Sequence, residues 1–152
     1  MKTLARPQDK AEILRRLTNL GPRSARRWGR MSPHQMVCHV ADAFRMCLGE
    51  TPTSRRGGLV HRTLVKWIAL YAPLRWPAGI LTAPEINQEL AGTRPAEFAA
   101  DVARLEALVE LVTAARGHSD WPLHPVFGRM SGAAWLRWGY LHMDHHLRQF
   151  GA

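Results

Sequence analysis

Apolar residues recur along most of the chain at the three- and four-residue spacing of amphipathic helices. Proline and glycine residues separate these periodic segments. The pattern predicts five helices, over residues 8–19, 33–48, 58–72, 95–115 and 131–150, and no convincing strand. We therefore expect an all-α fold whose core is an up-and-down four-helix bundle, with an additional short helix and long loops.

Two of these helices have clear start signals. Ser32 and Ser131 stand at N-cap positions, and Pro33 occupies the first helical position, where its missing N–H costs nothing. The stretch 73–95 contains four prolines and predicts a long irregular connection. Connections of this length inside a compact domain are often functional.

The composition suits one domain over residues 1–152. Hydrophobic residues make up 46% of the chain, enough for a single core. The net charge of +9 is uneven, because residues 1–66 hold 14 Lys/Arg against 4 Asp/Glu and the remainder holds 7 against 8. A basic half can indicate a nucleic-acid partner. We favour an arginine-rich solvated surface, since no groove-reading motif accompanies the charge.

No apolar run is long enough to span a bilayer, and the arginine-rich first thirty residues do not resemble a signal peptide. We therefore expect a cytoplasmic protein with no membrane partner. Cys38 and Cys47 would lie on opposite sides of one helix, so they are not expected to form a disulfide.

The last predicted helix carries two histidines on its apolar face. His142 and His146 are four residues apart, so their side chains lie one turn above the other. A helical wheel places both in the middle of the stripe that contains Trp135 and Trp138. A buried unpaired imidazole costs on the order of 1–3 kcal/mol. A metal ion, or hydrogen bonds to nearby carbonyl or hydroxyl groups, would remove that cost.

A third ligand must come from another helix. His39 falls on the shoulder of the apolar stripe of the second predicted helix, from where it can point into the core. A lone histidine in this position is as readily a hydrogen-bonded core residue. His34, in the first turn, is expected to face solvent.

Two sequence segments resemble the signatures of a known family. They run from Trp28 to His39 (WGRMSPHQMVCH) and from His142 to Gln149 (HMDHHLRQ). Both are similar to motifs of the DinB/YfiT-like metalloenzyme superfamily, and the segments at 76–79, 82–85 and 124–128 resemble one branch of it. The resemblance implies a four-helix core, a divalent-metal site formed by His39, His142 and His146, and often a homodimer.

The expected cofactor is therefore a divalent ion, zinc, nickel or iron, all of which accept imidazole ligands. Three histidines leave a coordination position open, which is typical of catalytic sites. The resemblance implies a metal-dependent enzyme acting on a small molecule, such as transfer or addition of a low-molecular-weight thiol. A non-catalytic metal-binding or stress-associated protein is the alternative.

Several polar residues are candidates for positioning a ligand or a bound water. Gln35 and Asp42 share the side of the helix that carries His39, and Gln149 lies three residues beyond His146. His145 falls at the edge of the apolar stripe and is expected to support the site or to lie at the surface. Aromatic and histidine side chains in irregular segments are candidates for lining the mouth of the site; these are Trp28, Trp76 and His124.

Overall fold

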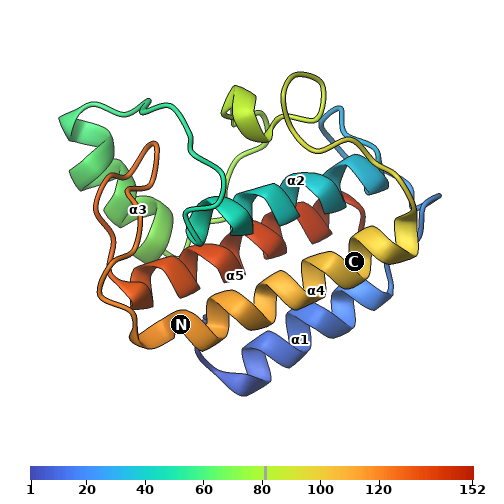
Figure 1. Ribbon diagram of the computed structural model, residues 1–152, viewed down its shortest axis with the longest axis horizontal. Helices are drawn as coiled ribbons and strands as arrows, with labels where there is room; N and C mark the ends of the chain where they lie inside the picture. Colours follow the sequence, from blue (N-terminus) through green and yellow to red (C-terminus); the bar gives the residue numbers. More distant parts are fainter. Residues whose placement is uncertain (81) are drawn as a thin grey trace.

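The computed structural model describes residues 1–80 and 82–152, and its regular structure is helical (Figure 1). Over these residues there is no β-strand, and the extended pairing is limited to a single bridge between His124 and Gly128. The prediction of an all-α fold is confirmed. The α-helices are α1 (Pro7–Thr18), α2 (Pro33–Cys47), α3 (Lys66–Tyr71), α4 (Phe98–Ala114) and α5 (Gly132–Gln149).

The starts of α2 and α5 are fixed by the serine caps that the sequence predicts. Ser32 Oγ accepts a hydrogen bond from the Gln35 backbone at 3.1 Å, and Gln35 Oε1 accepts one from the Ser32 backbone at 2.8 Å. This reciprocal pair is a capping box. Ser131 Oγ accepts from the Ala134 backbone in the same way. A side-chain cap therefore fixes the residue at which each of these two helices begins.

The segment predicted as one helix over 58–72 is more irregular than expected. A π-helical turn over His61–Val65 leads into the short helix α3. Leu70 is the buried residue of α3. Few contacts with the core are therefore available to stabilise a regular helix here. The connection after it is irregular as predicted, with one 3₁₀ turn over Pro84–Ile86.

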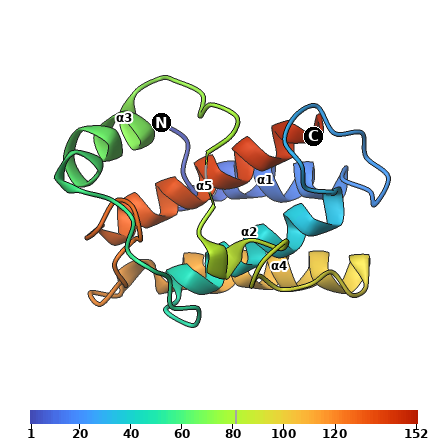
Figure 2. The same ribbon diagram turned by 90° about the horizontal axis from the view of Figure 1, so that it is seen from above.

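Four longer helices, α1, α2, α4 and α5, lie alongside one another, and α3 sits at one end of them (Figures 1 and 2). Helices α1 and α5 run in the same direction, because Leu4 bonds to Leu136 near their starts and Arg16 pairs with Asp144 further along. Helix α2 packs on both α4 and α5.

The chain directions correct the expected simple up-and-down order. Helices α2 and α4 also run in the same direction, since His34 meets Asp101 at their first turns and Cys47 lies near Ala115 at their ends. The long connection after α2 carries the chain back to the end where α2 began. Consecutive long helices therefore do not alternate in direction throughout.

Helices α2 and α5 approach closely and run in opposite directions. A Cβ atom placed on Gly139 of α5 would lie 2.9 Å from Leu4 Cδ1 and 3.0 Å from Phe44 Cε1 of α2. Both of these side chains are completely buried. The glycine thus sets the closeness of the two helices, one turn before His142.

No helix among the described residues combines the length and the apolar character needed to cross a bilayer.

Replacing Gly139 by alanine tests this close approach. Alanine favours a helix by about 1 kcal/mol over glycine, but the added methyl group would press on two fully buried side chains. We expect Gly139→Ala to lower the free energy of unfolding by about 1–3 kcal/mol, measured by urea denaturation. Gly58→Ala is the matched control, because a Cβ there meets no atom within 4 Å. A Gly139→Ala protein as stable as the original would contradict the tight contact.

Candidate metal centre

Three histidines from two helices meet in the core between α2 and α5. His39 Nε2 lies 3.2 Å from His142 Nε2, and His146 Nε2 lies 3.1 Å from the same atom. All three residues are buried, with at most 8% of their surface exposed. Ligand atoms of the three rings lie within 4.8 Å of one another. The antiparallel packing of α2 on α5 brings His39 opposite the His142–His146 pair.

Hydrogen bonds fix the protonation of two of these rings. His39 Nδ1 lies 2.8 Å from the Ile86 carbonyl oxygen, which can only accept, so Nδ1 carries the proton. His146 Nδ1 lies 3.1 Å from Gln149 Oε1 and donates to it. The amide of Gln149 is oriented by its Nε2, which donates to the Trp28 carbonyl at 2.8 Å. In both neutral rings, Nε2 therefore presents a lone pair to the centre of the cluster.

His142 is held by aromatic packing. The Trp138 ring lies 4.6 Å from its ring and the Trp76 ring 6.2 Å, measured between centroids. Its Nδ1 is buried and has no hydrogen-bond partner among the described residues. Its Nε2 faces the other two Nε2 atoms, which leaves the three nitrogens directed at one small region.

The donor set fits a divalent transition-metal ion. Two nitrogens bound to a tetrahedral zinc ion at about 2.0–2.1 Å are separated by about 3.3 Å. The observed separations of 3.1 and 3.2 Å are close to this value. Imidazole nitrogens are ligands for zinc, nickel and iron alike.

The electrostatics keep all three rings neutral, as metal ligation requires. Burial lowers the pKa of His39, although its bond to Ile86 and the charge of Asp42 oppose the shift. Burial, with repulsion from the neighbouring histidines, holds the pKa values of His142 and His146 well below the ordinary range. Protonation of any of them in the folded protein is therefore unfavourable near neutral pH.

Of the four residues expected to support the ligands, Gln149 is the one that hydrogen-bonds an imidazole. The side chain of Gln35 is used in the capping box of α2. Asp42 instead binds Arg45, Gln88 and Thr93. By sequence spacing alone, Gln35, Asp42 and Gln149 were equally good candidates for a hydrogen bond to an imidazole.

His145 lies beside the cluster rather than in it. Its ring is 5.1 Å from that of His146, 6.0 Å from Trp28 and 6.1 Å from Trp76. It is buried, and its Nδ1 has no hydrogen-bond partner among the described residues. Trp28 and Trp76, which the sequence offered as lining residues, thus both pack against the histidine side of α5.

Two backbone carbonyl groups support the site and were not predicted. The Ile86 carbonyl binds His39, and the Trp28 carbonyl orients Gln149. Carbonyl groups leave no signature in the side-chain pattern. The nearest sequence signals were the segment 82–85, which precedes Ile86, and the segment 28–39, which begins at Trp28.

A second group of potential ligands has a structural explanation. His34, which was expected to face solvent, is half-buried and lies 2.8 Å from Asp101 Oδ2. Asp101 also accepts hydrogen bonds from the Ala96 backbone and from Arg104. Cys38 Sγ donates to Asp101 Oδ2 at 3.7 Å, and burial, with the adjacent carboxylate, raises the pKa of the Cys38 thiol to about 12. The group joins the first turns of α2 and α4.

His124 lies behind the cluster. It is buried, and its ring is 5.2 Å from that of Trp138, which also packs against His142. Its Nδ1 accepts hydrogen bonds from the backbones of Val126 and Phe127 at 3.2 and 3.1 Å, which stabilises a tight turn. Burial lowers its pKa to about 3.

Comparison with protein families gives one match, and it covers nearly the whole chain. Residues 4–152 match the model of a family described as protein of unknown function, DUF1569. The chain belongs to this family. No curated protein and no solved structure matches the chain. The three histidines, Gln149 and both carbonyl groups that support them all lie inside the matched DUF1569 region.

The pKa of His124 predicts a pH-dependent stability. Because its pKa falls from 6.5 to about 3 on folding, protons bind the unfolded chain preferentially between these values. Its contribution is complete above pH 6.5, and is lost at about 1.4 kcal/mol per pH unit as the pH falls. His124→Asn keeps an acceptor for the turn but does not titrate. We expect its free energy of unfolding to depend less steeply on pH below 6.5, measured by urea denaturation.

The matched control is His118→Asn, which makes the same substitution at an exposed position. Parallel pH curves for His124→Asn and the original protein would show that His124 titrates normally when folded.

Proposed function

We propose that His39, His142 and His146 bind one divalent metal ion through their Nε2 atoms. The observation that carries this proposal is the convergence of the three nitrogens at 3.1 and 3.2 Å in a buried site. We also propose that the four longer helices form the four-helix core of the DinB/YfiT-like superfamily, whose signature residues are those of this site.

His39, His142 and His146 would hold a divalent ion through three neutral imidazoles, and such an ion would supply Lewis acidity toward a water or a thiol. The chain's own contribution is to hold the ligands in one tautomer. The Ile86 carbonyl does this for His39 and Gln149 does it for His146. Trp76 and Trp138 pack on His142 and exclude water from that side.

Within this proposal the reaction is transfer or addition of a low-molecular-weight thiol to a small electrophile. This step is supported by the resemblance to the superfamily. It predicts that the metal-loaded protein consumes a small thiol and an alkyl halide faster than the metal-free protein does.

A non-catalytic metal-binding protein is the second candidate. The observation that favours it is the burial of all three ligand residues. A protein that binds the metal stoichiometrically and turns over no thiol and electrophile pair would support this candidate over the enzyme.

Removal of the histidine pair tests metal binding directly. We expect the purified protein to bind about one ion per chain and His142→Ala/His146→Ala to bind almost none, measured by elemental analysis after dialysis against zinc. The control is His61→Ala/His118→Ala, which removes the same number of histidines from exposed positions. Circular dichroism checks that each variant is folded. Equal metal content in a folded His142→Ala/His146→Ala protein would refute the site.

Gln149 allows a finer test, because it touches a ligand but not the ion. Gln149→Leu removes the acceptor that holds His146, so we expect metal affinity to fall by about 10- to 100-fold, measured by competition with a chromogenic chelator. Gln35→Leu is the matched control, since Gln35 caps α2 and contacts no imidazole. An affinity that is the same in both variants would exclude a supporting role for Gln149.

A further inference from the structure

One stretch of the chain combines apolar and cationic residues and lacks acidic ones. Between Glu50 and Glu85 there is no aspartate or glutamate, while five residues are lysine or arginine. This stretch contains the π-helical turn His61–Val65 and α3. The absence of acidic residues is notable in a chain with 12 of them.

Large apolar side chains of this stretch are exposed to solvent. Trp67, for example, is 59% exposed, and α3 lies at the end of the long helices, where it has little cover (Figure 1). The exposed large apolar residues here are Leu59, Val60, Leu64, Val65, Trp67, Ile68, Tyr71 and Leu74. Exposed large apolar side chains concentrated in one segment in this way are typical of an interaction site.

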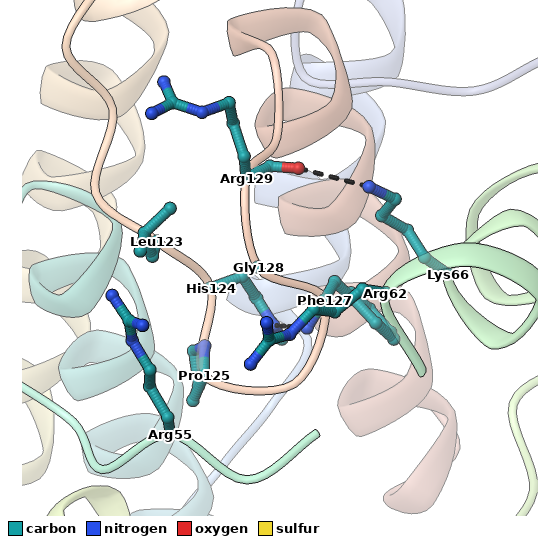
Figure 3. Close-up of a pocket in the computed structure, with 9 residues that line it drawn as sticks. All are labelled: Arg55, Arg62, Lys66, Leu123, His124, Pro125, Phe127, Gly128 and Arg129. Carbon is teal, nitrogen blue, oxygen red and sulfur yellow. Dashed lines mark hydrogen bonds between the residues drawn. The ribbon is translucent and has the colours of Figure 1, made fainter. Parts of the chain in front are cut away.

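A cationic pocket adjoins this helix. It has a volume of about 350 Å³ and lies between the helix and the loop 123–129. Its lining includes Arg62, Lys66 and Arg55, and Figure 3 shows Arg62 and Lys66 beside the loop on the helix side and Arg55 on the other side of the loop. Arg129 is the fourth cation of its lining, which contains no acidic side chain among the described residues.

Two of these cations, Lys66 and Arg62, contact the loop 123–129. Lys66 Nζ donates to the Arg129 carbonyl at 3.2 Å. Arg62 lies across Gly128, whose φ of +66° lets the loop turn beneath it, and a Cβ there would be 3.3 Å from Arg62 Cδ. Within residues 1–80 and 82–152, no carboxylate lies within 4.0 Å of any of the four cations.

In contrast to the expectation from the sequence of no membrane partner, we propose that this face docks on an anionic phospholipid surface. The apolar side chains of the helix enter the interfacial region, and the pocket of Arg55, Arg62, Lys66 and Arg129 receives a phosphate headgroup. Interfacial helices of this type join an apolar face to basic residues, and tryptophan and tyrosine are enriched at the level of the headgroups. Trp67 and Tyr71 supply those aromatic rings.

Charge distinguishes a lipid surface from a second copy of the chain. A symmetric dimer through this face would place the same cations opposite one another, with no acidic residue in the stretch to pair with them. An anionic bilayer offers the complementary charge and an apolar layer together.

Co-sedimentation with lipid vesicles tests the proposal on the full chain. We expect binding to vesicles of phosphatidylcholine mixed with phosphatidylglycerol, little binding to pure phosphatidylcholine, and loss of binding as salt is raised. Arg62→Gln/Arg129→Gln should weaken binding by about fivefold for each charge removed. Trp67→Ser should weaken it by about tenfold, through the lost interfacial anchor.

Matched controls lie on other faces. Leu111→Ser removes an apolar side chain that is 55% exposed on α4, and Arg15→Gln removes an exposed charge on α1. Both should bind like the original protein. Failure to bind the mixed vesicles, or weakening by the controls equal to that by the test variants, would overturn the proposal.

Two further measurements separate other occupants. Calorimetric titration with inorganic phosphate should give no saturable binding; saturable binding that is equally strong without vesicles would assign the pocket to a soluble anion and overturn the lipid assignment. Light scattering should give a molecular mass that Trp67→Ser does not change. A dimer that Trp67→Ser dissociates, in protein that does not bind vesicles, would assign the face to a second copy.

Discussion

Where α2 contacts α5, three imidazole nitrogens occupy one small space in the core. His39 and His146 carry their protons on Nδ1, so their Nε2 lone pairs both face His142. At most one proton, from His142 Nε2, can lie between these atoms while the rings stay neutral. A cation at the centre would satisfy all three lone pairs at once. Burial lowers the pKa values of the three rings, so this part of the core holds neutral imidazoles and not a cluster of charges.

The long connection between α2 and α4 contributes groups that contact the histidines from outside these helices. It supplies the Ile86 carbonyl that fixes His39 and the Trp76 ring that packs near His142 and His145. The same connection carries the exposed apolar helix and several cations of the pocket. Its length is needed because α2 and α4 run in the same direction, so the chain must return along the whole helix before α4 can begin.

Local sequence signals predicted the helices, and longer-range contacts decided the rest. Ser32 and Ser131 mark where α2 and α5 begin, because a cap is a contact over three residues. The periodic stripe placed His142 and His146 on a buried face, and both are buried. Spacing could not separate Gln149 from Gln35, because the choice depends on the Trp28 carbonyl in one case and on the Ser32 backbone in the other. Spacing also could not predict that α2 and α4 run in the same direction, because a connection of this length allows either direction.

The three histidines of the cluster also differ in when they can meet during folding. His142 and His146 are adjacent as soon as one helical turn exists, whereas His39 is 103 residues from His142. Closing a chain segment of that length must be paid in loop entropy before the third imidazole arrives. Contacts with so large a sequence separation slow folding and complete late. The His142–His146 pair therefore forms early, and the cluster of three imidazoles is complete only in the finished fold.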